Sequence, residues 1–348
     1  MRPLDVAGTG PSHLAMRPAL RRLAMAASFG LGGIVTTLLL AGGAVCLTSG
    51  CSTVGYYASS VTGHLNLVGA ARPVSSWLAD PATPEPLRQR LMLAQRMRDF
   101  AVNELGEPDN ASYRRYADLH RPAAVWNVVA APELSLRLQT WCFAVVGCVA
   151  YRGYYDPAAA EREAAALRER GLEVAVYPVP AYSTLGKLPG DWLADPLLNT
   201  FIDWSEAELA RLIFHELAHQ VAFAPGDTEF NESFATAVER IGSARWLARN
   251  GSETVLAENR GRELRRERFR ALTGAYRDSL QALYTSDLSV DAKRRRKLLL
   301  YATLRADYAN LRATSDGYRG YDEWFARANN ASFGVLAAYN GLAPQFER

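Results

Sequence analysis

The sequence has no internal repeat, no low-complexity segment and, beyond its first 50 residues, no excess of charge of either sign. Residues 1–50 contain four arginines and one aspartate, which accounts for the whole formal net charge of +3. The neutral remainder gives no electrostatic reason to expect nucleic acid as a partner. With 348 residues, of which 49% are hydrophobic, the chain can bury a sizeable core. We therefore expect one continuous domain over residues 51–348.

Cysteine is also scarce, and two of the four cysteines lie at the end of a candidate targeting segment. Three arginines precede an uncharged, largely apolar stretch over residues 23–47, and small residues then lead to Cys51. This order predicts a secretory leader over residues 1–50, with Cys51 as the lipidated first residue of the mature chain. An uncleaved membrane anchor is the alternative, because the apolar stretch is long enough to span a bilayer. The lipoprotein interpretation predicts a periplasm-facing protein of the bacterial cell envelope. Lipoproteins that stay in the inner membrane often have an Asp directly after the lipidated Cys. This chain has Ser52 at that position, which favours the outer membrane.

The other two cysteines, Cys142 and Cys148, form a closely spaced pair. In an exported protein such a pair is typical of a disulfide. Two buried free thiols packed as small apolar groups are the alternative. No further cysteine or histidine lies nearby to complete a metal site.

Short runs of branched and aromatic residues predict strands only in the first half of the chain. These runs cover residues 125–129, 143–146 and 173–177, and an Ala-rich helix is expected over residues 157–170. From residue 205 onward the pattern is almost entirely helical. The expected fold is α+β, predominantly α-helical, with a small β-sheet in the first half. The arginine-rich stretches at 260–270 and 293–297 are interpreted as solvated helix faces.

Histidine is scarce too, and of the four histidines after residue 50 two lie four residues apart, at His215 and His219. Ser205 followed by Glu208 has the pattern of a capping box and predicts the start of a helix. Residues four apart lie on one helix face, one turn apart, so both imidazoles can reach a single ion. Glu216 is displaced around the helix and can address a water on that ion. The pattern predicts one zinc ion with Glu216 as general base.

A catalytic zinc site needs a third protein ligand. After the Pro-Gly turn at residues 225–226, Asp227 or Thr228 can cap a second helix that folds back across the first. Glu232 and Glu239 lie seven residues apart on this helix and so on nearly the same face. The residues alone leave either one as the ligand. Apolar neighbours around both helices favour a metal, because unpaired polar side chains are costly in a buried helix.

The segments HELAHQ at 215–220 and NESFA at 231–235 resemble the gluzincin metallopeptidases, in particular the zinc aminopeptidases. In those enzymes the Glu of an Asn-Glu-x-Phe-Ala segment is the third ligand, so the resemblance implies Glu232. The interval between the second histidine and this Glu is shorter here than is usual in that group. The Gly-x-Met-Glu-Asn segment that binds the substrate amine in those aminopeptidases does not occur in this sequence, so exopeptidase and endopeptidase activity both stay open.

The sequence resembles the bacterial "putative aminopeptidase" lipoproteins more closely still, over nearly the whole mature chain. The resemblance implies a zincin-like metallopeptidase domain that acts on peptides. It is carried by short segments in order, which include Gly55-Tyr56-Tyr57, residues 126–133, Trp141-Cys142 with Gly147-Cys148, residues 180–186 and Asn329-Asn330-Ala331.

In the expected mechanism His215, His219 and Glu232 hold zinc, and Glu216 moves the proton of the attacking water to the leaving amine. Asn231 and Glu239 are expected to orient the ligands by hydrogen bonding. The oxyanion donor is sought among the tyrosines that flank predicted strands, Tyr151, Tyr154 and Tyr182. The alternative function is a lipid-anchored envelope protein with a structural zinc or a purely binding role.

Overall fold

A computed structural model of the chain describes residues 51–143, 147–181, 190–315, 317–340 and 342–348. The predicted leader over residues 1–50 lies outside these residues, as do Tyr182 and residues 144–146 of one predicted strand. The chain divides into two compact units, Met1–Ser59 and Ser60–Arg348. Across the described part of the chain, no helix combines the length and the apolar character that a membrane span requires. The second unit holds the sheets and the candidate site and is described below.

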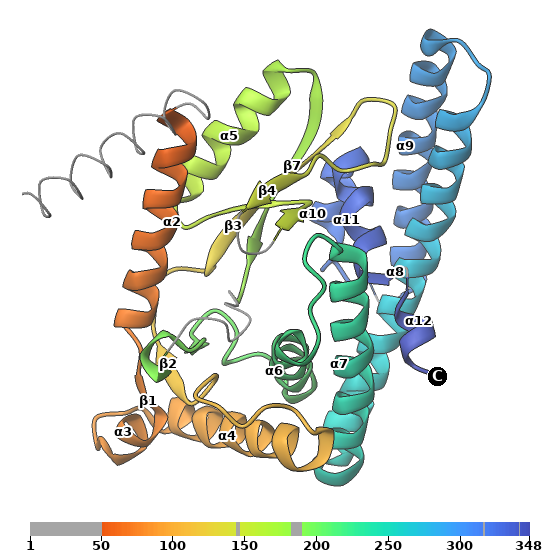
Figure 1. The fold of residues 1–348 in the computed structure, drawn as a ribbon. Helices are drawn as coiled ribbons and strands as arrows, with labels where there is room; N and C mark the ends of the chain where they lie inside the picture. The colour runs from red at the N-terminus through yellow and green to blue at the C-terminus, as the bar shows by residue number, and fades with distance from the viewer. Residues whose placement is uncertain (1–50, 144–146, 182–189, 316, 341) are drawn as a thin grey trace, which may run out of the picture. The chain divides into compact units, whose positions relative to one another are not determined.

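Helices dominate the second unit, and short strands are confined to its first half (Figure 1). The strands are β1 Arg72–Pro73, β2 Arg115–Ala117, β3 Val125–Pro132, β4 Trp141–Phe143, β5 Gly147–Val149, β6 Arg152–Tyr154, β7 Leu172–Val179 and β8 Leu197–Leu198. The helices are α2 Cys51–Gly69, α3 Val74–Ala79, α4 Glu85–Leu105, α5 Pro157–Glu169, α6 Glu206–Val221, α7 Thr228–Asn250, α8 Glu253–Thr285, α9 Val290–Ala313, α10 Asp322–Arg327, α11 Asn330–Asn340 and α12 Ala343–Phe346, with a short 3-10 turn at Asp191–Leu193. The predicted α+β, mostly helical class is confirmed.

The main sheet has three strands in the order β6-β3-β7, and both of its pairings are antiparallel. Helix α5 lies on one side of this sheet and α11 on the other (Figure 1). On the α11 side, Val129 and Ala131 of β3 pack against Ala331. Alternate residues of β7, Ala175 and Tyr177, have their side chains on this face. Tyr177 is paired with Asn127 of β3. This face of the sheet is therefore directed toward the C-terminal helices.

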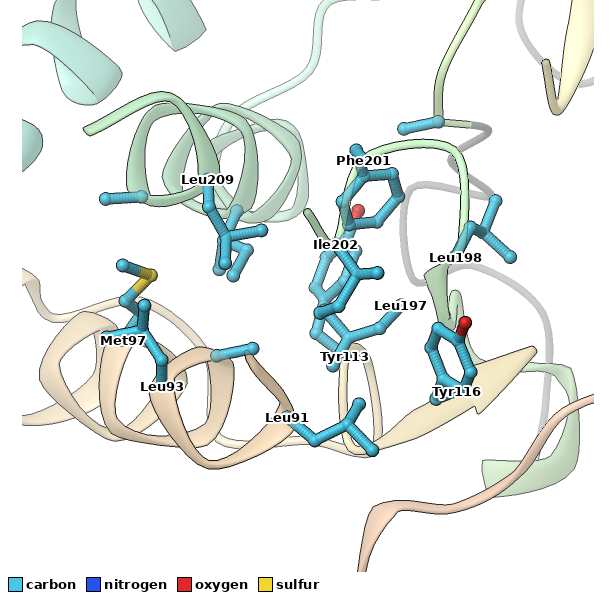
Figure 2. Close-up of a cluster of buried hydrophobic side chains, with 14 of the residues drawn as sticks. Leu91, Leu93, Met97, Tyr113, Tyr116, Leu197, Leu198, Phe201, Ile202 and Leu209 are labelled. Carbon is cyan, nitrogen blue, oxygen red and sulfur yellow. The ribbon is translucent and has the colours of Figure 1, made fainter. Parts of the chain in front are cut away.

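The largest hydrophobic core lies where α4 meets α6 and the segment at residues 197–202. Figure 2 shows Leu209 of α6 above Leu93 and Met97 of α4, with Ile202 alongside. Gly242 of α7 allows a close approach, because a Cβ there would lie 2.7 Å from Leu105 Cδ1 and 2.9 Å from Phe214 Cδ2. Helices α4 and α7 therefore pack closely against the apolar face of α6.

A second buried region joins α8, α9 and α11 through Asn330, whose side chain is fully buried. The amide nitrogen of Asn330 donates to the carbonyls of Pro132 and Glu133, at 3.0 and 2.8 Å. Its oxygen accepts from the hydroxyls of Tyr284 and Tyr301, at 2.7 and 2.9 Å. All four hydrogen-bonding positions of the amide are thus filled by protein groups. We call these five residues the Asn330 cluster.

Candidate metal centre

Helices α6 and α7 pack against each other with their contacting residues in opposite order along the chain, and this arrangement brings the candidate ligands together. At one end of the pair, Trp246 Nε1 donates to Glu206 Oε1 at 2.9 Å. Further along, Arg211 lies opposite Glu239, and His219 lies opposite Glu232. The turn between the helices begins α7 with Asp227, whose side chain caps the helix by accepting from the backbone nitrogen of Phe230 at 2.9 Å.

The start of α6 differs from its prediction in one respect. Ser205 precedes the first helical residue, as expected, but its side chain makes no capping hydrogen bond. Glu208, the second member of the predicted capping box, instead forms an ion pair with Arg266 of α8. A charged partner on a neighbouring helix therefore replaces the local contact with the backbone.

His215, His219 and Glu232 each present one ligand atom, and these three atoms lie within 4.8 Å of one another. Glu232 Oε2 is 3.3 Å from His215 Nε2 and 3.8 Å from His219 Nε2. Two ligands that are each about 2 Å from a tetrahedral ion lie roughly 3.3 Å apart, so these separations suit a small divalent cation. Two imidazole nitrogens and one carboxylate oxygen are also a donor set that zinc accepts.

Glu239 lies outside this group of three and holds His215 in place. Its Oε2 lies 2.9 Å from His215 Nδ1, and its Oε1 accepts from Arg211 Nη2 at 2.6 Å. Burial acts to raise the pKa of Glu239, but His215 and Arg211 overcome it and lower the pKa to about 2. A charged Glu239 fixes a proton on Nδ1 of His215 and leaves Nε2 to face Glu232.

The two histidines differ in their ionisation. Burial alone would lower the pKa of His215, but hydrogen bonds with Glu232 and Glu239 raise it well above its ordinary value. Burial and the charge of His215 lower the pKa of His219 to about 4. Among the described residues, no hydrogen-bond partner reaches His219 Nδ1. A neutral imidazole at His219 is the form that binds metal.

Glu216, the predicted base, lies beside this cluster on the same helix. Burial is the first cause that raises its pKa to about 7, and the charges of Glu232, Asp195 and Glu239 act in the same direction. The charge of His215 opposes them. A carboxylate with a raised pKa is a better proton acceptor than an ordinary one near neutral pH.

Asn231, which is expected to orient the ligands, makes its hydrogen bonds to the turn before α7. Its side chain accepts from the backbone nitrogen of Ala224 at 2.7 Å and donates to the carbonyl of the same residue at 2.9 Å. These bonds close the turn between α6 and α7. Asn231 therefore fixes the spacing of the two helices directly before Glu232, and its role in orienting the ligands stays a prediction.

Two tyrosines that sequence reasoning did not select lie near the site. Tyr113 is buried with a left-handed backbone (φ 62°), and after burial itself the charge of Glu216 is the first cause that raises its pKa. Tyr177 has its pKa raised to about 12 by burial and by the charge of Glu232, while a hydrogen bond with Asn127 opposes the rise. The alternation of β7 was a signal that could have placed Tyr177 on the inward face.

The structure describes two of the three tyrosines that the sequence offers as oxyanion donors. Tyr151 packs against the cluster of Val129, Ala131 and Ala331. Tyr154 is buried in β6 with the Arg152 guanidinium 5.8 Å from its ring centroid. Their role as oxyanion donors stays a prediction.

A disulfide joins Cys142 and Cys148 across the β4–β5 hairpin, at directly paired positions. This hairpin approaches the turn between α6 and α7. A Cβ at Gly147, where φ is +75°, would lie 2.9 Å from the backbone nitrogen of Gly226. Only glycine fits at this contact.

The fold and the site together define a mostly helical α+β protein with a candidate His-His-Glu metal centre on an antiparallel helix pair. Comparison with known families is specific: residues 55–348 match the family described as "Putative aminopeptidase", and the chain belongs to this family. No curated protein and no solved structure matches the chain.

Proposed function

We propose that this protein is a zinc-dependent peptidase with a gluzincin-like, zincin-type site. The observation that carries the proposal is the convergence of His215, His219 and Glu232 within 4.8 Å, with Glu216 on the same helix. The family description supports a peptidase and suggests aminopeptidase activity. Peptides are the proposed substrates, and one zinc ion is the proposed cofactor.

His215, His219 and Glu232 would hold the ion, and Glu239 would keep His215 in the correct tautomer. A bound zinc ion would supply Lewis-acid chemistry, which polarises a carbonyl and makes water a better nucleophile. Glu216 would take the proton of the attacking water and deliver it to the leaving amine. Its raised pKa suits both steps, because the group must gain and lose a proton near neutral pH.

The proposed location is the bacterial cell envelope. Lipidation at Cys51 after removal of residues 1–50 would anchor the protein to the membrane, facing the periplasm, with the outer membrane favoured. This proposal is supported by the basic, apolar and small-residue segments of the sequence and by the following Ser52.

Glu216→Gln is the variant that tests catalysis separately from metal binding. We expect it to keep one equivalent of zinc and to lose hydrolysis by about 10²- to 10⁴-fold, because only the base is removed. Glu229→Gln, an exposed carboxylate on α7, is the matched control and should leave both unchanged. Zinc content and cleavage of a peptide library, read by mass spectrometry, give the two measurements.

Three outcomes would separate the proposed function from its alternatives. Unchanged hydrolysis in a zinc-loaded Glu216→Gln protein would remove the catalytic role of this residue. One equivalent of zinc in the wild-type protein with no cleavage of any library peptide would favour a structural zinc. Cleavage confined to the first residue would define an aminopeptidase, and internal cleavage would define an endopeptidase.

A further inference from the structure

Beyond the metal ligands, an unbroken chain of ion pairs runs from His215 to the arginine-rich part of α8. We infer that Arg211, supported by Glu263 and Arg266, is a positioning residue that fixes Glu239 and, through it, the imidazole of His215. The inference rests on the proposed function, because it assigns these residues to the support of the zinc site. Glu263 and Arg266 belong to the stretch at 260–270, which the sequence alone indicates to be a solvated helix face. The inference assigns these two residues to the support of the site instead.

The inner part of the chain uses both oxygens of one carboxylate. Arg211 and His215 lie one turn apart on α6 and share Glu239 as partner. Arg211 Nη2 donates to Oε1 at 2.6 Å, while His215 Nδ1 lies 2.9 Å from Oε2. Because each oxygen is engaged, the carboxylate plane has little freedom to rotate, and the imidazole that it holds is fixed as well.

The outer part of the chain ties Arg211 to α8. Arg211 Nη1 donates to Glu263 Oε1 at 2.5 Å, and Arg266 Nη1 donates to the same oxygen at 2.8 Å. Arg266 also pairs with Glu208, which lies one turn before Arg211 on α6. The four residues thus close a ring between α6 and α8.

The burial of the side chains decides which pairs of the chain should matter most. Arg270 also interacts electrostatically with Glu263, Arg211 and Arg266, so the network as a whole has no formal excess of negative charge. The side chain of Arg211 is 11% exposed, whereas those of its outer partners Glu263 and Arg266 are 37% and 26% exposed. Water screens the outer pairs more, so their influence on the metal should be smaller.

Arginine is required at residue 211 by geometry as well as by charge. A planar guanidinium offers separate nitrogens to Glu239 and Glu263 at the same time. A lysine ammonium keeps the charge but has no fixed fork. Arg211→Lys should therefore retain only part of the effect, while Arg211→Gln should lose nearly all of it.

The experiment measures zinc affinity by chelator competition in the full chain, together with the visible spectrum of the Co²⁺-loaded protein and urea unfolding of the metal-free protein. For Arg211→Gln we expect zinc affinity to fall about 10- to 100-fold, with a changed Co²⁺ spectrum. Arg211→Lys, Glu263→Gln and Arg266→Gln should show smaller losses. Arg268→Gln is the control, because Arg268 lies on the same helix but donates to Ser315 Oγ at 2.8 Å.

Each result decides between the inference and a simpler explanation. Wild-type zinc affinity and Co²⁺ spectrum in Arg211→Gln, with only the urea midpoint lowered, would show that the chain serves stability alone. An equal loss of affinity in Arg268→Gln would show a general effect of charge and would also overturn the inference. Failure of the wild-type protein to bind zinc would refute the proposed function itself, and the inference with it. Zinc binding that is unaffected by Arg211→Gln would refute the inference alone.

Discussion

The candidate metal centre and the Asn330 cluster both bury polar side chains, but they balance them in opposite ways. In the Asn330 cluster, donors and acceptors are matched: two carbonyls and two hydroxyls fill the four positions of one amide. In the metal centre, His215, His219 and Glu232 direct nitrogen and oxygen atoms at one another. Such atoms are all electron-pair donors, so only a proton or a cation can join them.

This contrast shows how burial of polar groups can distinguish a structural cluster from a binding site. The Asn330 cluster is complete within the protein and adds hydrogen bonds between α8, α9, α11 and the end of β3. The candidate metal centre needs a positive charge between these atoms, and a proton on His215, whose pKa is raised well above its ordinary value, can supply that charge when no ion is bound. Loss of a residue should therefore affect stability in the first region and ligand binding in the second.

The largest effect is expected for Asn330→Leu. This change keeps the volume of the side chain but leaves the two buried hydroxyls without their acceptor, while the carbonyls of Pro132 and Glu133 still accept from Ser135 N and Lys297 Nζ. At about 1–3 kcal/mol for each orphaned hydroxyl and about 0.5–1.5 kcal/mol for each bond lost at a carbonyl, the free energy of unfolding should fall by at least about 3 kcal/mol. Urea unfolding measures this loss, and chelator competition on the folded fraction should show wild-type zinc affinity. A large drop in zinc affinity would mean that the two regions are coupled, since α11 also packs against α7.

A smaller effect is expected from the metal itself. Zinc at 100 times its dissociation constant should stabilise the folded wild-type protein by about 2.7 kcal/mol. Glu232→Gln removes a charged candidate ligand and should abolish most of this increment. The metal-free variant should also lose some stability, because His215 and His219 outweigh burial and lower the pKa of Glu232, so that its charged form stabilises the fold. Urea unfolding with zinc and with a chelator measures the difference. A zinc-dependent shift that survives in Glu232→Gln would transfer the third ligand to another residue, with Glu239 the first to test.

Glu107 shows a third way to accommodate a buried polar group, in which the carboxyl keeps its proton. The smallest change in stability is expected here. Burial raises its pKa to about 8, with the charge of Arg98 opposing, and no hydrogen-bond partner lies near it among the described residues. Its pKa is higher in the folded than in the unfolded chain, so its contribution to stability is complete below about pH 4.5 and is lost as the pH rises through 8. Between pH 6 and 8.5 the loss amounts to about 2 kcal/mol.

Glu107→Gln should remove this pH dependence, because the amide remains neutral throughout. Urea unfolding at pH 6 and pH 8.5 compares the two proteins, and the variant should be the more stable at the higher pH. Parallel loss of stability in both proteins between these pH values would show that another group titrates. The result would also test the comparison of the Asn330 cluster with the candidate metal centre. A buried carboxyl that has neither a hydrogen-bond partner nor a cation is expected to keep its proton.

Local sequence patterns were sufficient for the parts of the site that lie within one helix turn or one helix pair. The four-residue spacing of His215 and His219 and the Pro-Gly turn indicated which residues could meet. Glu232 and Glu239 are seven residues apart and so share one helix face, which is why the sequence leaves both as alternatives. In the structure Glu232 lies at Nε2 of His215 and Glu239 at Nδ1. These relations depend only on helix geometry.

Relations that depend on packing between distant segments could not be predicted. The pattern at Ser205 and Glu208 indicated a cap, but the nearby Arg266 of α8 is the partner of Glu208. Tyr113 lies 103 residues before Glu216, and its loop is held to α6 by Gln220, which donates to Ser112 Oγ at 3.1 Å. No periodicity in a single segment contains this information. Charged and aromatic residues have too many alternative partners for a local rule to select one.

The turn that Asn231 closes also has a consequence for the order of assembly. Only twelve residues, 220–231, separate the candidate ligand His219 on α6 from the candidate ligand Glu232 on α7. Closing so short an interval costs little conformational entropy compared with bringing α8, α11 or the sheet into place. Helical hairpins also form faster than structures that depend on distant strand pairing. An ion could thus be captured by α6 and α7 while the remainder of the chain is still folding, and the bound ion would then favour the register on which the later helices dock.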